Sequence, residues 1–582
     1  MILQFRSTAT SPLILTPSKH DRFCSQPSTE LKFKNPNLSL LELCTSMDEL
    51  KQLHAQLILS GHAHQTLPLS RLIAFTALHP HGDLGYARLL FDRRSEDPNI
   101  FIWSTMIRAY SNSTFPELGI EFYVLMLQNG VVPENFTIPF VLNACAEVSA
   151  GKEGRMVHGQ ALKLGLYSNE FVQNGLVKLY LSAGDFGSAH LLFDGFSEPS
   201  EVAWNMLIDG YGKIGEVEFA HQLFVKMPQS GIIAMNSILA AYVRLGDLDV
   251  AQMLFDDMPR RDITSWNTLI DGYFLNGEFK KALEVFHHML MEKIKPDKVT
   301  LALVLSSCGE LGAIEQGRWI HNYIKVNEME INVYIGTSLI HMYAKSGFIE
   351  YAYKVFNEMS KRDALVWNVM IGSLAMHGLA AQSLDLFARM DLEGVVPNEL
   401  TFLGVLSACS HVGLVSEGLK QFNSMTGDYN IEATDKHYAC MVDLFGRAGM
   451  FEEATEFIDR MPRKPNPSVW GALLSACKIH GKKELGAAAG KHLIELDPQG
   501  DGRYVLVSNL YAASGNWTKA SEIRRLMMQK GIKKTPGCSL IEVDGFVHEF
   551  LVGDRNHPRT EEIYSMMAML TKEMKSLGRK DE

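Results

Sequence analysis

Asparagine recurs at one register along this chain, each time early in a segment with helical periodicity. An apolar pair follows two residues after Asn205, Asn267 and Asn368. An amide side chain both donates and accepts hydrogen bonds, so a row of amides suits recognition of a polar ligand. A single asparagine early in a helix is usually a cap, but recurrence in five segments favours a binding role. The five are Asn174, Asn205, Asn236, Asn267 and Asn368.

The sequence contains none of the common catalytic motifs that we searched for. Neither H-x-E nor C-x-x-C occurs, although a zinc deaminase needs both. The P-loop, H-E-x-x-H and G-x-S-x-G patterns are also missing. Cys145, Cys308, Cys409 and Cys477 fall at one repeat position, which predicts small packing residues. We predict that the protein is not an enzyme and has no cofactor and no metal site.

Tryptophan marks a long repeat. Trp103 and Trp204 lie 101 residues apart, as do Trp266 and Trp367. Met235 lies 31 residues from both Trp204 and Trp266. Such periods indicate an array of stacked supersecondary units, and these arrays are usually binding surfaces. The tryptophans are predicted to pack between helical hairpins rather than to stack on a ligand.

Residues 263–297 show what one repeat is. An apolar stripe led by Trp266 recurs at helical spacing until Asn276-Gly277 breaks the helix. A second apolar stripe follows, and Pro296 ends it because proline cannot continue a helix. One hairpin cannot bury both stripes alone, so stacked hairpins are predicted to form an α-solenoid.

The repeats are of three kinds. Those of 35 residues with the Trp-led start are 100–134, 263–297 and 364–398. A second kind of 35 residues comprises 135–169 and 298–332. Those of 31 residues are 170–200, 201–231, 232–262 and 333–363.

Composition allows a soluble, well-packed chain. Of 582 residues, 46% are hydrophobic and 21% are charged. No apolar stretch is long enough to span a membrane. The net charge of −11 is unusual for a nucleic-acid binder, although a basic groove can lie on an acidic array. Residues 1–40 are rich in Ser and Thr, which predicts an organellar transit peptide or a disordered tail.

This pattern resembles the plant pentatricopeptide-repeat proteins of the PLS class, because the three kinds of repeat follow that family's order and lengths. A tetratricopeptide array has a uniform 34-residue period instead. The resemblance implies an all-α fold, an α-solenoid of stacked helix-turn-helix repeats forming a right-handed superhelix with a small C-terminal extension. The implied segments are a transit peptide or tail (1–40), degenerate repeats (41–99), the repeat array (100–466), E-type repeats (467–534) and an extended-E domain (535–582).

The last segment sharpens the resemblance. TPGCSLIEVDGFVHEFLVGDRNHPRTEEIY, residues 535–564, is similar to the family's extended E domain, although Leu540 stands where many relatives have tryptophan. Longer relatives carry a DYW deaminase domain after it. This sequence stops at Glu582 without the deaminase residues, so the chain is expected to lack that domain.

In this family the fifth and the last residue of each repeat select one base of single-stranded RNA. The resemblance implies the pairs Asn174–Ser200, Asn205–Gly231, Asn236–Asp262, Asn267–Asp297, Thr337–Asp363 and Asn368–Asn398. Pro139 and Ala302 at the fifth position cannot bond a base edge, so their repeats are expected to be spacers. The implied target is C, pyrimidine, U, U, any base, G, pyrimidine, 5′ to 3′.

The resemblance implies a sequence-specific RNA-binding protein that recognises sites of organellar C-to-U RNA editing. A deaminase-bearing pentatricopeptide-repeat protein would be recruited in trans through the E and extended-E regions. One alternative is an organellar RNA-binding factor for splicing, stability or translation. Another is a protein–protein scaffold, which the acidic charge favours. The expected location is the chloroplast or the mitochondrion, with a slight preference for the chloroplast, and no membrane partner is expected.

Overall fold

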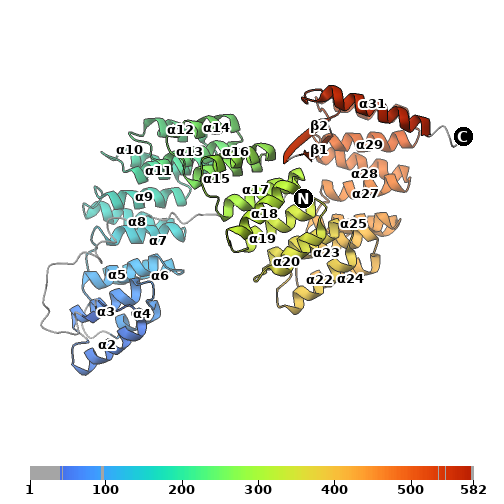
Figure 1. The fold of residues 1–582 in the computed structure, drawn as a ribbon. Coiled ribbons are helices and arrows are strands. Elements are labelled where there is room, and N and C mark those ends of the chain that lie inside the picture. Colours follow the sequence, from blue (N-terminus) through green and yellow to red (C-terminus); the bar gives the residue numbers. More distant parts are fainter. Residues whose placement is uncertain are drawn as a thin grey trace. The chain divides into compact units, whose positions relative to one another are not determined.

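A computed structural model describes residues 40–41, 43–63, 65–93, 98–534, 537–543 and 545–577. The expected transit segment, 1–40, lies outside the described residues except for Leu40. The chain divides into two compact lobes, Met1–Ile238 and Leu239–Glu582. Each lobe is a stack of antiparallel helical hairpins (Figure 1), which confirms the α-solenoid.

Each hairpin of the first lobe pairs a first helix, which starts the repeat, with a second helix. The bounds are α2 (Met47–Leu59), α3 (Thr66–Leu78), α4 (Leu84–Asp92), α5 (Ile100–Ser111), α6 (Pro116–Gln128), α7 (Thr137–Glu147), α8 (Gly151–Lys163), α9 (Glu170–Ser182), α10 (Phe186–Asp194), α11 (Glu201–Ile214) and α12 (Val217–Lys226). The lobe boundary falls inside α13 (Ile232–Leu245).

The second lobe continues the alternation of first and second helices. The bounds are α14 (Leu248–Asp256), α15 (Ile263–Leu275), α16 (Phe279–Met291), α17 (Lys298–Leu311), α18 (Ile314–Val326), α19 (Val333–Lys345), α20 (Ile349–Glu358), α21 (Ala364–Met376), α22 (Ala380–Leu392), α23 (Glu399–Val412), α24 (Val415–Gly427), α25 (Asp435–Arg447), α26 (Phe451–Asp459), α27 (Pro467–Ile479), α28 (Lys483–Leu496), α29 (Asp501–Ala513) and α30 (Trp517–Gln529).

The repeat at 263–297 folds as its sequence predicts. Asp262 caps α15 with a side-chain hydrogen bond to the Ser265 amide. The helix closes at Asn276, and Gly277 takes φ +78°, a left-handed turn that glycine adopts without strain. The chain then reverses into α16. Predicted helix, break and second helix are therefore confirmed.

Aromatic contacts join the second helix of one repeat to the first helix of the next. The Trp266 ring meets Phe255 edge-to-face at 4.8 Å, and the Trp367 ring meets Phe356 in the same way at 4.9 Å. Trp266 and Trp367 are buried, so the prediction that they pack in the core is confirmed. The four repeated cysteines are fully buried as well, as expected of packing residues.

The C-terminal extension adds strands to the array. Strands β1 (Cys538–Val543) and β2 (Phe546–Leu551) pair antiparallel, with Val543 opposite Phe546 across a tight turn. Gly545 occupies this turn at φ +76°. Helix α31 (Thr560–Leu577) follows. No strands are predicted here from the sequence, because a short hairpin leaves only a weak pattern.

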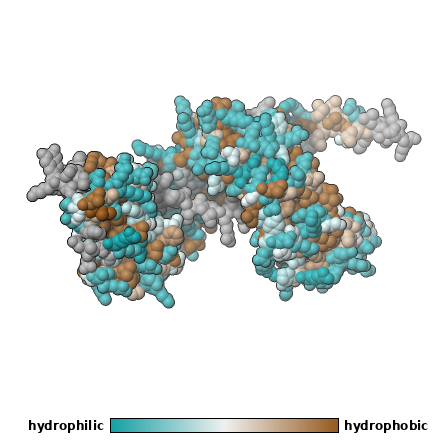
Figure 2. All heavy atoms as spheres, turned by 90° about the horizontal axis from the view of Figure 1, so that it is seen from below, coloured by the Kyte–Doolittle hydropathy of each residue, from teal (hydrophilic) through white to brown (hydrophobic). Residues whose placement is uncertain are grey.

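Polar residues cover much of the surface. Figure 2 shows one face, largely hydrophilic with small hydrophobic patches. Among the helices of the described residues, none is both long and apolar enough to cross a membrane.

Candidate functional site

The fifth and last residues of a repeat meet because first helices pack side by side. Helix α15 contacts α17, and α21 contacts α23. The fifth residue lies about one turn into its first helix, and the last residue caps the next first helix. Both residues therefore lie where neighbouring first helices begin, and we call this line of positions the cap edge.

Asn267 and Asp297 form a hydrogen-bonded pair at the cap edge. Asn267 Nδ2 donates to Asp297 Oδ1 at 3.2 Å. The same Oδ1 accepts from the backbone amides of Val299 and Thr300, which fixes the carboxylate at the start of α17. Thr300 Oγ1 donates to Asn267 Oδ1 at 2.6 Å. These bonds leave the second Nδ2 hydrogen of Asn267 and Asp297 Oδ2 for a ligand.

The pair Asn368 and Asn398 repeats this arrangement. Asn368 Nδ2 donates to Asn398 Oδ1 at 2.9 Å, and Thr401 Oγ1 donates to Asn368 Oδ1 at 2.5 Å. Asn398 caps α23 through the Leu400 and Thr401 amides. The group left over on Asn398 is an NH₂ donor, where Asp297 has an acceptor.

The pair Asn174 and Ser200 is also joined, with the opposite polarity. Ser200 Oγ donates to Asn174 Oδ1 at 2.7 Å and accepts from the Ala203 amide at 3.2 Å. Because the Asn174 oxygen is occupied, its NH₂ group is the part of the amide that remains to donate.

Thr337 and Asp363 are not bonded to each other in the described structure. Thr337 Oγ1 donates to the Val333 carbonyl at 2.5 Å and the Tyr334 carbonyl at 3.0 Å, which turns the hydroxyl hydrogen into its own helix. Asp363 Oδ1 accepts from the Leu365 and Val366 amides at the start of α21. What remains at this position is acceptor capacity on both side chains.

The pair Asn205 and Gly231 is only partly formed. Asn205 is 8% exposed, and its Oδ1 has no hydrogen-bond partner among the described residues. A Cβ at Gly231 would collide with the Glu201 carboxylate, which fills the place of the missing side chain. This repeat therefore presents the amide of Asn205 without a second polar side chain from its last residue.

The remaining predicted pair is divided between the lobes. Asn236 lies on the first-lobe part of α13, and Asp262 caps α15 in the second lobe. Asn236 is therefore described relative to the first lobe, and Asp262 relative to the second lobe.

The threonines that orient Asn267 and Asn368 were not predicted from the sequence. Thr300 and Thr401 stand at the third position of the following first helix and complete capping boxes with Asp297 and Asn398. The pattern Asp/Asn-x-x-Thr was visible in DKVT and NELT. This pattern indicates that the threonines complete the caps, but not that they contact the asparagines of the preceding repeat.

Two arginines that hold the caps were missed as well. Arg261, just before the capping residue Asp262, donates to the carbonyls of Phe255 and Asp256 and pairs with Glu292 at 3.2 Å. Arg362, just before Asp363, donates to the Phe356 carbonyl and pairs with Glu393 at 3.2 Å. The arginine of each Arg-Asp dipeptide therefore links the loop before a first helix to the end of the second helix in the same repeat.

A second feature of the cap edge is a pocket of about 510 Å³ beside the starts of α23, α25 and α27. Its lining includes Glu399, Thr434, His437 and Asn466. His437 Nδ1 lies 2.9 Å from Thr434 Oγ1, and its Nε2 lies 2.8 Å from the Glu399 carbonyl. Burial lowers the pKa of His437, which favours the neutral ring, and its Nδ1 accepts from the Thr434 amide in the capping box of α25.

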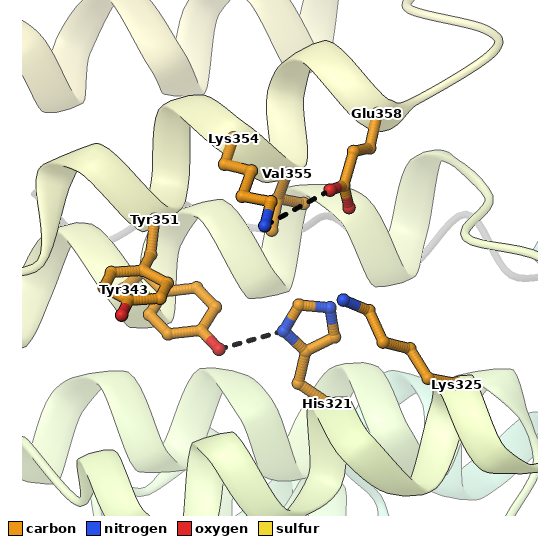
Figure 3. A pocket seen from close by; sticks show the side chains of 7 residues that line it. All are labelled: His321, Lys325, Tyr343, Tyr351, Lys354, Val355 and Glu358. Carbon is orange, nitrogen blue, oxygen red and sulfur yellow. Dashed lines mark hydrogen bonds and ion pairs between the residues drawn. The ribbon is translucent and has the colours of Figure 1, made fainter.

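A smaller pocket of about 130 Å³ lies away from the cap edge, on α18, α20 and the end of α19 (Figure 3). His321 Nδ1 lies 2.9 Å from the Tyr343 hydroxyl within it. The same contact recurs between His158 and Tyr180 at 3.0 Å. Because it recurs between successive repeats, we assign this contact to packing of the array. None of the predicted pairs lines this pocket.

The described residues hold no group of three or more His, Cys, Asp or Glu side chains arranged for a metal ion. The amides, hydroxyls and carboxylates at the cap edge can form hydrogen bonds with a ligand.

Comparison with known families identifies the repeats. The model of the PPR repeat matches 101–131, 202–232, 233–263, 337–363, 365–395 and 437–465, and that of the PPR repeat family matches 261–310. One pentatricopeptide repeat-containing protein of Arabidopsis thaliana is 44% identical over 542 residues, which cover 93% of this chain and 82% of the relative. The chain belongs to the pentatricopeptide-repeat family.

The family's C-terminal motifs are present too. The E motif matches residues 480–542 and the E+ motif matches 547–574, which confirms the resemblance to pentatricopeptide-repeat proteins with E and extended-E regions. Two further Arabidopsis thaliana relatives in this family carry an organelle in their names. One, named chloroplastic, is 41% identical over 96% of this chain and 95% of its own length. Another, named mitochondrial, is 36% identical over 93% and 90%.

The pentatricopeptide-repeat fold is also found by comparison with solved structures. The crystal structure of the maize pentatricopeptide repeat protein PPR10 matches with a TM-score of 0.50 and 17% identity, over 86% of this chain and 90% of that one. At that identity the likeness concerns the fold alone.

Proposed function

We propose that this pentatricopeptide-repeat protein binds single-stranded RNA in a sequence-specific manner along the cap edge. The observation that carries the proposal is the repeated hydrogen-bonded pair, seen at Asn174–Ser200, Asn267–Asp297 and Asn368–Asn398. In each pair the last residue also caps a helix, which restricts its side chain before a ligand binds. Rigid donors and acceptors lose little entropy when a base edge pairs with them.

The groups left over at each pair support the proposed bases. Asp297 Oδ2 is an acceptor suited to the N3–H of uracil, whereas Asn398 leaves a donor. The NH₂ group of Asn174 suits the acceptors of cytosine. The carboxylate of Asp363 suits the N–H donors of guanine. The proposed target remains C, pyrimidine, U, U, any base, G, pyrimidine.

We further propose that the protein marks sites of organellar C-to-U editing and that a separate deaminase-bearing protein performs the reaction. The E and E+ motifs support this role. The exposed apolar face of α31, formed by Met566, Met567, Leu570 and Met574, is suited to a protein partner. The chain itself would then act by binding, without a catalytic step.

RNA binding is tested with full-length protein and short RNAs that carry the proposed target. The matched control replaces the guanosine opposite Thr337 and Asp363. Tight binding that weakens by about tenfold with that replacement supports the register, since one base contact is worth about 1–3 kcal/mol. Equal binding to both RNAs, or none to either, contradicts the proposal.

The editing role is tested by removing the protein from the organism and sequencing organellar transcripts. A cytidine a few nucleotides 3′ of the bound element should stay unedited. Complementation with a chain that ends at Asn466 should restore RNA binding but not editing. If the truncated chain restored full function, a role in splicing, stability or translation would be favoured instead. Normal editing at every cytidine in the knockout would exclude the editing role.

An organellar location is part of the proposal. The names of close relatives support a chloroplast or a mitochondrion. The Ser- and Thr-rich first 40 residues give a slight preference for the chloroplast. Fluorescent fusion of those residues in leaf cells decides between the two organelles.

A further inference from the structure

The start of helix α18 lacks a cap of its own. Gly312, in the left-handed region at φ +65°, and Ala313 lead into the helix, and Ala313 has no side chain to accept a hydrogen bond. The first amides of any helix have no partner within the helix. They also form the positive end of the helix dipole, where a carboxylate is stabilising.

Glu542, from strand β1, fills this position. Its Oε2 accepts from the Glu315 amide at 2.7 Å, and its Oε1 accepts from the Gln316 amide at 3.0 Å. The side-chain Nε2 of Gln316 donates in return to the Gly545 carbonyl. Figure 1 draws the red hairpin beside α17 and α18. Three hydrogen bonds thus join segments separated by more than 220 residues of sequence.

Both partners on the hairpin belong to its tip. Glu542 is one residue from the end of β1 and lies opposite Val547. Gly545 is in the turn at φ +76°, and its carbonyl accepts from the Gln316 side chain. A carboxylate that is half-buried needs hydrogen-bond donors, and the α18 amides supply them. The tip is therefore fitted to this helix start by geometry and by charge.

The contact is not a general feature of the repeat. Helix α8 occupies the equivalent place in the earlier repeat of the same kind, and it also begins after an alanine cap, Ala150. Its equivalent amides belong to Lys152 and Glu153, and among the described residues no side chain accepts from them. Helix α8 is thus an internal reference for α18.

We infer that Glu542 is a positioning residue that docks the β1–β2 hairpin on the start of α18. The docked tip fixes where the C-terminal extension lies on the second lobe. If the protein has the proposed editing function, the docked tip also holds the recruited partner at a set distance from the bound RNA. Only this consequence rests on the proposed function.

Amide hydrogen exchange of the full-length protein tests the docking without RNA or a partner. In the wild type, the Glu315 and Gln316 amides should exchange about tenfold more slowly than those of Lys152 and Glu153, after correction for intrinsic rates, since a charge-assisted bond is worth about 1.4 kcal/mol or more. Glu542→Ala should abolish this difference, and Glu542→Gln should leave part of it.

The matched control is Glu549→Ala, which removes the same charge from an exposed position on the same hairpin. It should leave exchange at α18 unchanged. Gln316→Ala should loosen the tip from the other side and speed exchange in the turn around Gly545. Unchanged exchange at Glu315 and Gln316 in Glu542→Ala overturns the inference.

The consequence for editing is measured separately. Glu542→Ala should retain wild-type RNA affinity, because the contact is remote from the cap-edge pairs, while conversion at the target cytidine falls several-fold. Normal conversion with altered exchange would overturn the positioning role. If the wild type proves to have no role in editing, the proposed function fails and the exchange experiment still decides the docking.

Discussion

At the scale of residues, one side chain both caps a helix and carries a proposed RNA-binding group. Asp297 caps α17 with Oδ1 and bonds Asn267 with the same atom, so only Oδ2 is left for a ligand. Asn398 uses its Oδ1 in the same way and leaves an NH₂ group. Aspartate and asparagine are equally good caps, so exchanging them alters the chemistry offered to a base without altering the fold.

The first prediction exploits that equivalence. Asp297→Asn recreates the Asn368–Asn398 arrangement and replaces an acceptor with a donor. The variant should lose about tenfold affinity for RNA with uridine at its position, which corresponds to about 1.4 kcal/mol, and gain relative affinity for cytidine. Paired titrations with the two RNAs measure this, and thermal unfolding checks that the cap survives. An unchanged preference for uridine would mean that Asp297 does not select the base.

A second residue-scale prediction concerns His321. Burial, and to a smaller extent the charge of Lys325, lowers the pKa of His321 to about 4, whereas the unfolded value is near 6.5. Between these values the unfolded chain binds more protons than the folded one, so stability is lost as pH falls from 6.5 toward 4. His321→Gln should lose less in unfolding temperature between pH 7 and 5 than the wild type. Exposed His288→Gln is the control, and an identical pH dependence in all three proteins contradicts the assignment.

At the scale of elements, the hairpin and its breaks could be read from the sequence because the apolar period and the glycine at each turn are local signals. Asn276-Gly277 marked its turn correctly. The pairing of Asn267 with Asp297 was implied by family resemblance, and only the structure shows that Thr300 orients the amide. Contacts between first helices are non-local, so neither this network nor the docking of Glu542 could be predicted from spacing.

The element-scale prediction tests the packing that brings first helices together. Trp266 is buried against Phe255, so Trp266→Ala should cost about 3–5 kcal/mol of the local unfolding free energy. Trp319 is 50% exposed on α18, and Trp319→Ala should cost less than about 1 kcal/mol. Urea unfolding and exchange of the α15 amides measure both. Equal losses would show that the recurring tryptophan is not a core residue.

At the scale of the whole molecule, the net charge of −11 opposes the approach of an RNA. The proposed binding along the cap edge would then depend on contacts with bases more than on a general attraction for phosphate. Repulsion between two polyanions is screened by salt, which offsets part of the affinity that salt removes through counterion release. A basic RNA-binding protein does not repel RNA, so salt only weakens its binding.

The last prediction follows from that balance. The logarithm of RNA affinity should fall with the logarithm of salt concentration, but with a shallow slope equivalent to fewer than about five neutralised phosphates. Replacing the guanosine opposite Thr337 and Asp363 should lower the whole line without changing its slope, because base contacts carry specificity and phosphate contacts carry salt dependence. Fluorescence anisotropy between 50 and 300 mM salt measures both lines. A steep slope that is the same for unrelated RNAs would show that phosphate contacts dominate, and binding with no salt dependence or base preference would favour a protein scaffold.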